Sequence, residues 1–244
     1  MKAAATVVCA LLSLALAAVG GWLVYSLGVW FTVGYVALCA VFFPFALLIH
    51  EFGHILFGTL AGMKVALSRA GIFSPYASCT VMPKKSSHIK ARYTAALAGG
   101  LVLGALFCIA GAALLAVGGL AAFFSFVLPS SFYVFLLNAL PLTYAEGGTD
   151  MLAICRNLSD APSAVVARRV LYIQGLLSEG TPLEEIDENL LFDVPQISED
   201  EPEFIVLVSI RADYYKAVND DKKAAFWAQR LEELMQYLPE GYAG

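Results

Sequence analysis

The chain has 244 residues, of which 59% are hydrophobic and 14% are charged, and its formal net charge is −5. This composition is typical of an integral membrane protein. Residues 1–149 carry a net charge of +5 and the remainder carries −10, without a basic stripe, which argues against a nucleic-acid-binding protein. The five cysteines are scattered and form no C-x-x-C pair, so they indicate neither a disulfide framework nor a cysteine metal site.

Four stretches are long enough to cross a bilayer, which requires about 20 mostly apolar residues. We place them at residues 3–27, 33–61, 93–117 and 120–140. The first could be a signal peptide because Lys2 precedes it, but its apolar run is longer than the usual length of about 7–15 residues. We therefore expect an all-α integral membrane domain over residues 1–150, with about four transmembrane helices.

The second span contains the sequence His50-Glu51-Phe52-Gly53-His54, which has the H-E-x-x-H pattern of zinc hydrolases. Each ionisable side chain inside a membrane costs about 2.5–3.5 kcal/mol on insertion scales, so an idle cluster is disfavoured. Residues four apart share one helix face, so both histidines can bind one metal ion while Glu51 acts on a metal-bound water. The alternative is a chance match, with the three side chains satisfied by neighbouring helices.

The connection at residues 63–92 has intermittent strand character and holds six of the seven basic residues of the membrane half. The positive-inside rule places this loop, and with it both chain termini, in the cytoplasm. The strand-like part could be an ordered surface loop, or an edge strand that pairs with an extended substrate. His88 lies among lysines in this loop, where we expect a solvated side chain.

The third span is rich in glycine and alanine, which favours close helix packing. The fourth span is interrupted by Pro129 and Pro141, which lie on either side of Asn138. Proline near a membrane helix end leaves backbone groups that protein or a water-filled cavity must satisfy. We look for a third metal ligand in the segment that follows, up to Asp150.

Residues 151–244 are expected to form a small, acidic, soluble helical domain. Thr181-Pro182-Leu183-Glu184 has the pattern of a capping box at a helix start, and further helices are predicted near residues 203–218 and 222–238. The pattern indicates a hairpin bundle, possibly tetratricopeptide-like. Such a domain is more often a binding module for a protein partner than an enzyme.

Three segments resemble the site-2 protease family of intramembrane zinc metalloproteases. They are L-L-I-H-E-F-G-H at residues 47–54, A-G at 98–99 and N-A-L-P at 138–141, and the likeness covers about residues 41–151. The resemblance implies that His50 and His54 bind Zn²⁺ and that Glu51 is the general base. It also implies that Asn138 holds the substrate backbone or polarises the scissile carbonyl.

The resemblance leaves two positions for the third zinc ligand. The family's usual spacing from its asparagine falls on Glu146, whereas members with a longer connection end in Thr-Asp, which matches Thr149-Asp150. Asp150 is preferred because it begins a predicted helix. Gly100 stands where the family often has proline.

The sequence therefore predicts a zinc-dependent endopeptidase that cleaves a membrane-protein substrate within or next to its transmembrane segment. One alternative is a membrane metalloprotease of the kind that trims prenylated C-termini, but the expected second E-x-x-x-D/H pairing is missing from the membrane half. The other is a non-catalytic pseudoprotease scaffold that binds membrane helices and recruits partners through its soluble tail.

Overall fold

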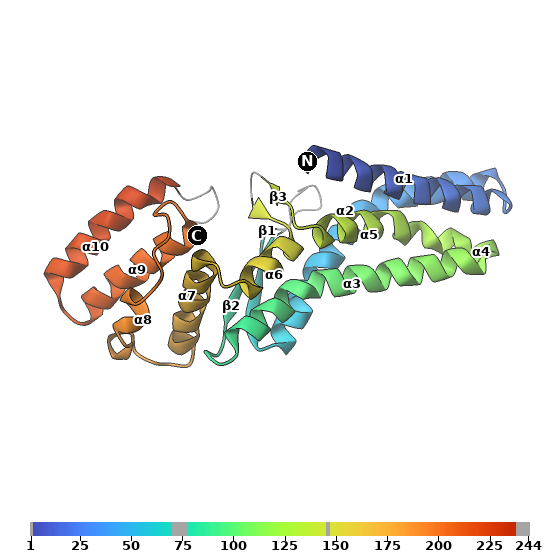
Figure 1. Ribbon diagram of the computed structural model, residues 1–244. Helices are drawn as coiled ribbons and strands as arrows, with labels where there is room; N and C mark the ends of the chain where they lie inside the picture. The colour runs from blue at the N-terminus through green and yellow to red at the C-terminus, as the bar shows by residue number, and fades with distance from the viewer. Residues whose placement is uncertain (1, 70–77, 145–146, 238–244) are drawn as a thin grey trace. The chain divides into compact units, whose positions relative to one another are not determined.

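The computed structural model describes residues 2–69, 78–144 and 147–237 and is mostly helical (Figure 1). The chain divides into two compact units. One contains Met1–Val81 and Thr94–Cys155, and the other contains Met82–Tyr93 and Arg156–Gly244. Helix α6 (Asp150–Leu158) thus begins in the unit of the long apolar helices, and the domain boundary at residue 150 stays a prediction.

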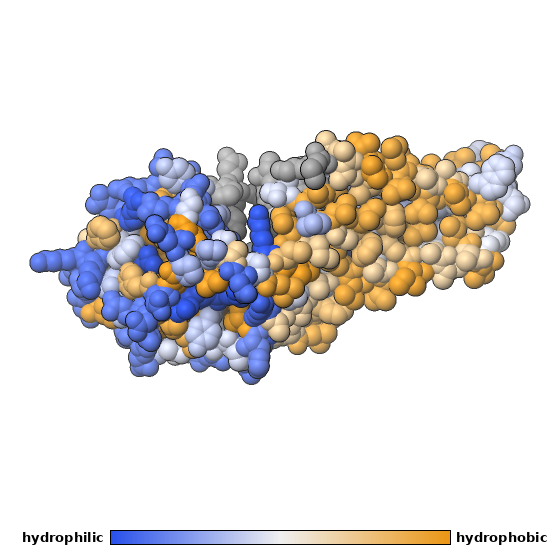
Figure 2. All heavy atoms as spheres, in the orientation of Figure 1, coloured by the Kyte–Doolittle hydropathy of each residue, from blue (hydrophilic) through white to orange (hydrophobic). Residues whose placement is uncertain are grey.

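Within the described residues, four helical stretches are long and apolar enough to cross a membrane, as the sequence predicts. They are α1 (Lys2–Tyr25), α2 (Val29–Leu60), α3 (Ile89–Val117) and a fourth stretch over Gly119–Ala139. Figure 2 shows that the surface of these helices is largely apolar. Trp22 and Trp30, on either side of the α1–α2 turn, are 81% and 82% exposed, which fits a membrane–water interface.

The fourth stretch is a broken helix, made of α4 (Gly119–Phe123), the 3-10 turn η1 (Phe124–Phe126) and α5 (Val127–Ala139). Pro129 explains the break, because a proline ring collides with the carbonyl four residues earlier in a regular α-helix. At the other end, Leu140 is extended. The residue before a proline avoids the helical region, so Pro141 ends α5.

Small and polar side chains join these helices. The Ser13 hydroxyl on α1 donates a hydrogen bond to the carbonyl of Pro129, and the Ser130 hydroxyl donates to Cys39 O on α2 at 3.0 Å. On α3, a side chain at Gly111 would meet Leu128 Cβ at 2.7 Å. At this position, α3 and α5 can approach closely only because residue 111 is a glycine, as the prediction of close packing requires.

The connection between α2 and α3 contains two paired strands, β1 (Met63–Arg69) and β2 (Ser78–Pro83), which confirms its strand character. The intervening part of the prediction falls outside the described residues. A second pair, β3 (Thr143–Tyr144) and β4 (Gly147–Gly148), is antiparallel and lies between α5 and α6.

The second unit contains α7 (Pro162–Ser178), α8 (Asn189–Phe192), α9 (Pro202–Ala217) and α10 (Asp221–Leu234), with the 3-10 turns η2 (Leu183–Glu185) and η3 (Met235–Tyr237). Helices α9 and α10 match the two predicted C-terminal helices. The helix predicted from the capping box at Thr181 is wrong, because only η2 forms there. Ile186 leaves the turn in an extended conformation and is buried in the core of the unit.

Residues 82–93 belong to this second unit, and several contacts of the described residues hold them there. Ser86 donates from its N and Oγ to Glu179 Oε2 at 3.1 and 2.6 Å. Gly175 lies so close to Ser86 that an added Cβ would be 2.7 Å from its Cα. The Asn157 amide donates to Lys90 O at 3.0 Å. The segment that enters α3 is therefore fixed by α6 and α7.

Arg211 on α9 is a buried cation held without a carboxylate contact among the described ion pairs. Its Nε and Nη2 donate to Leu191 O at 3.0 and 2.7 Å, and the guanidinium lies over the rings of Phe192 and Trp227 at 4.6 and 4.8 Å. These contacts join α8, α9 and α10. Cation–π contacts of this kind are favourable when water is excluded.

We expect Arg211→Met to lower the free energy of unfolding of this unit by about 2–4 kcal/mol, because two hydrogen bonds from a charged donor and the ring contacts are lost. Denaturant unfolding of the full chain measures this effect, with Trp22 and Trp30 replaced by phenylalanine so that Trp227 reports alone. Arg156→Met is the control, since Arg156 is exposed. Equal stability of the two variants would contradict the prediction.

Candidate metal centre

His50 and His54 lie one turn apart on α2 and point to the same place. Their side chains are buried, with residue exposures of 4% and 6%. The two Nε2 atoms are 3.3 Å apart, and the rings meet edge to face at 88°. This is the arrangement that the H-E-x-x-H spacing predicts for two imidazoles on one helix face.

Asp150, the first residue of α6, adds a third donor atom. Its Oδ2 lies 3.0 Å from His50 Nε2 and 3.3 Å from His54 Nε2. Donor atoms around a tetrahedral zinc ion with bonds of about 2.0–2.1 Å are about 3.3–3.4 Å apart. The triangle of two nitrogens and one oxygen therefore has dimensions that suit a metal ion of this size.

The hydrogen bonding of Asp150 also fits a cation. Its Oδ2 is buried and has no hydrogen-bond partner within the described part of the chain, in spite of the two nearby nitrogens. A buried polar atom left unsatisfied costs about 1–3 kcal/mol. A buried carboxylate oxygen that faces two imidazole nitrogens without a hydrogen bond is a suitable metal ligand.

The second nitrogen of His54 is held by the backbone of α3. His54 Nδ1 lies 2.9 Å from Ala96 O, to which it donates its proton. When the ring is neutral, its lone pair is then on Nε2, toward Asp150. Such a hydrogen bond is the usual way in which proteins orient a histidine that binds metal.

Glycines allow α3 to approach α2 at the motif. A Cβ added to Gly99 would overlap the backbone of Gly53. A Cβ added to Gly100 would lie 2.6 Å from both His50 Cε1 and His54 Nε2. Position 100 therefore requires a glycine, where the resembled family often has proline.

We expect Gly100→Ala to weaken zinc binding by at least about 10-fold, because the methyl group displaces both imidazoles and ligand orientation controls affinity. Competition with a chromophoric chelator measures the dissociation constant. Gly104→Ala, one turn further along α3, is the control, since its Cβ would meet Phe135 Cβ at 3.4 Å. Unchanged zinc affinity of the Gly100 variant would contradict the geometry.

Glu51 is buried, at 9% exposure, and lies beside the two histidines. The ligand atoms of the three residues all lie within 4.8 Å of one another. Cys79 on β2 also lies beside Glu51, with its Sγ 3.8 Å from the backbone oxygen of that residue. Burial and the Glu51 carboxylate raise the pKa of the Cys79 thiol, which keeps it protonated.

The structure brings His50, Glu51, His54 and Asp150 together. Asn138 lies near the end of α5, is half-buried and donates from Nδ2 to Val134 O at 3.0 Å. No hydrogen bond among the described residues joins it to the other four, and its role in substrate binding stays a prediction.

Two further candidates, Glu146 and His88, came from the sequence. Glu146 lies outside the described residues. His88 is exposed and has a positive φ of 55° just before α3, where its carbonyl accepts a hydrogen bond from Arg92 N at 3.0 Å.

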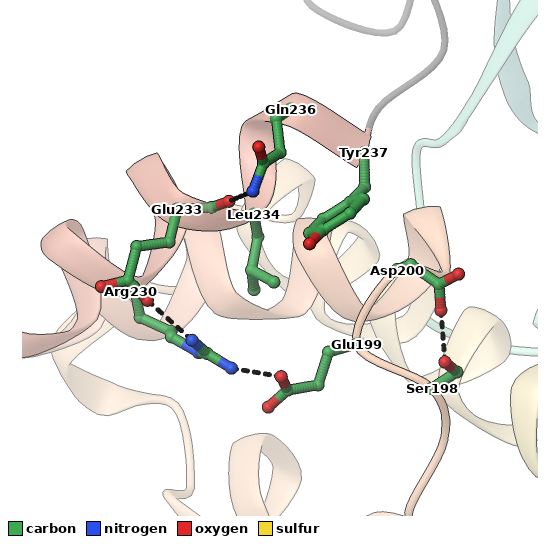
Figure 3. Close-up of a pocket in the computed structure, with 8 residues that line it drawn as sticks. All are labelled: Ser198, Glu199, Asp200, Arg230, Glu233, Leu234, Gln236 and Tyr237. Carbon is green, nitrogen blue, oxygen red and sulfur yellow. Dashed lines mark hydrogen bonds and ion pairs between the residues drawn. The ribbon is translucent and has the colours of Figure 1, made fainter.

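A separate hollow lies in the second unit, between the segment before α9 and the end of α10 (Figure 3). It is lined by Ser198, Glu199, Asp200, Arg230, Glu233, Leu234, Gln236 and Tyr237. Arg230 forms ion pairs with Glu199 and Glu233, and the Ser198 hydroxyl bonds to Asp200. These polar groups are paired with one another and are exposed or half-buried. None of them is a buried polar atom without a hydrogen-bond partner, as Asp150 Oδ2 is.

Neither a protein-family model, nor a curated protein, nor a solved structure matches the chain. The case for a function therefore depends on the metal centre itself and on the apolar helices that hold it.

Proposed function

We propose that this protein is an integral-membrane zinc endopeptidase that cleaves a membrane-protein substrate within or next to its transmembrane segment. The observation that carries the proposal is the triangle of His50 Nε2, His54 Nε2 and Asp150 Oδ2, with sides of 3.0–3.3 Å, beside the buried Glu51. Three protein ligands leave a fourth position of a tetrahedral ion open, which is characteristic of catalytic rather than structural zinc. The position of the motif in an apolar helix supports a substrate that lies in the membrane.

His50, His54 and Asp150 would hold the ion. When bound, zinc supplies Lewis-acid chemistry: it polarises a carbonyl and lowers the pKa of a bound water to about 7. Glu51 accepts a proton from the water as its oxygen attacks the scissile carbonyl. The same carboxyl group then delivers that proton to the leaving amine as the C–N bond breaks.

The surrounding elements suggest how a substrate would be presented. Cys79 places β2 directly beside Glu51, so an extended segment paired with the β1–β2 sheet would pass close to the carboxylate. Extended peptides commonly bind by adding a strand to a sheet. We further infer, from the basic residues of the connection at residues 63–92, that this connection and both chain termini face the cytoplasm. The helices α7–α10 would bind a protein partner.

Zinc analysis and proteolysis of the full chain in liposomes test the proposal. We expect about one zinc ion per chain and cleavage of a single-span substrate, loss of both with 1,10-phenanthroline, and recovery of both on adding zinc. A chain that neither contains nor takes up zinc would instead favour the scaffold function. One bound zinc ion without hydrolysis of any substrate in a panel of single-span proteins would overturn the enzymatic part.

A further inference from the structure

The third ligand atom is not positioned by the helix that carries the other two. Asp150 follows a ten-residue connection from the end of α5 at Ala139, and the described residues of this connection contain only the short β3–β4 pair. A side chain as short as aspartate reaches a metal only if its backbone is placed correctly. Something in the connection must therefore fix the start of α6.

Thr149 makes the contacts that close this connection. Its Oγ1 donates to Leu140 O at 2.5 Å, with Leu142 O also near at 3.3 Å, and accepts from Leu142 N at 3.1 Å. Its backbone N donates to Leu142 O at 3.0 Å. Thr149 is only 4% exposed, so these bonds are shielded from water. The two ends of the connection are thus fastened together directly before Asp150.

Thr149 also begins α6, since its carbonyl accepts the hydrogen bond of Ala153 N at 3.0 Å. A threonine in this place ordinarily uses its hydroxyl to cap the helix. Here the hydroxyl is directed back to the preceding loop. This is the bonding expected of a residue that fixes a loop rather than one that caps a helix.

We propose that Thr149 is a positioning residue, whose hydroxyl sets the place of Asp150 and with it the affinity and coordination geometry of the metal centre. The inference rests on the proposed zinc site. Its physical basis is that a ligand is effective only when its supporting contacts hold it within a fraction of an ångström of the productive geometry. Loss of such supporting contacts usually weakens metal binding by about 10–100-fold.

Three variants of the full chain in detergent test the role of the hydroxyl. Thr149→Val removes it at nearly constant shape, Thr149→Ser retains it, and Thr143→Val is the control in the same connection, because Thr143 is exposed. We expect zinc to bind about 10–100-fold more weakly to Thr149→Val, within about threefold of wild type to Thr149→Ser, and unchanged to Thr143→Val. The absorption spectrum of the Co²⁺-loaded chain should change only in Thr149→Val, because the oxygen ligand is displaced.

Equal zinc affinity of Thr149→Val and wild type would overturn this inference while leaving the zinc site intact. Affinity as weak in Thr149→Ser as in Thr149→Val would also overturn it, because the hydroxyl would then not be the cause. If Thr149→Val does not fold, the smaller Thr149→Ala replaces it in the same comparison with Thr149→Ser. A wild-type chain without zinc affinity would remove the proposed function together with this inference, so the two failures are distinguishable.

Discussion

Replacing Asp150 with alanine is expected to remove zinc from the purified protein. The substitution deletes one of three donor atoms that lie 3.0–3.3 Å from one another and leaves two imidazoles alone. Since lost supporting contacts already weaken metal binding by about 10–100-fold, loss of a ligand should weaken it by more than about 100-fold. Metal content after dialysis against a weak chelator, measured by mass spectrometry, should fall from about one zinc ion per chain to below about 0.1.

Two other acidic residues provide the controls. Asp160→Ala removes a side chain that is 92% exposed and pairs only with Arg168 at 3.6 Å among the described ion pairs, so its zinc content should match wild type. Glu146→Ala tests the other position that the sequence leaves open for the ligand. Full zinc content in Asp150→Ala together with loss of zinc from Glu146→Ala would show that Glu146, and not Asp150, is the third ligand.

The apolar helices could be predicted because a bilayer imposes both their length and their internal hydrogen bonding. The first and last residues of these helices were predicted less accurately. The third span was expected to begin at residue 93, yet α3 starts at Ile89 and includes Lys90 and Arg92. Hydropathy detects the apolar part of a helix, whereas backbone hydrogen bonding continues beyond it. The helix predicted at Thr181 does not form, because the burial of Ile186 in the core outweighs the local capping pattern.

In the candidate site, too, some features could be predicted from the sequence and others could not. His50, Glu51 and His54 lie within five consecutive residues, so helix periodicity alone predicts that the two histidines share a face. Asp150 reaches the histidines only through tertiary structure. From the sequence it was one of two alternatives for the third ligand, the other being Glu146. The contacts of Cys79 with Glu51 and of Thr149 with the loop before it were not predicted, because they depend on chain segments that meet only in the fold.

Glu51→Gln is expected to abolish cleavage while zinc binding persists. Glutamine keeps the shape of the side chain but cannot accept the proton of the attacking water. A general base contributes about 10²–10⁴-fold to the rate, so kcat should fall by about that factor, with little change in KM. Single-turnover cleavage of a single-span substrate in liposomes measures the rate, and zinc content is determined on the same samples.

Glu179→Gln is the matched control, because it makes the same substitution at an exposed carboxylate bonded to Ser86. Its rate and zinc content should equal those of wild type. Undiminished cleavage by Glu51→Gln, after identical purification that excludes contaminating proteases, would remove Glu51 from the role of base. Asp150→Ala should lose zinc and cleavage together, whereas Glu51→Gln should lose cleavage alone. That difference separates the residue that holds the ion from the residue that moves the proton.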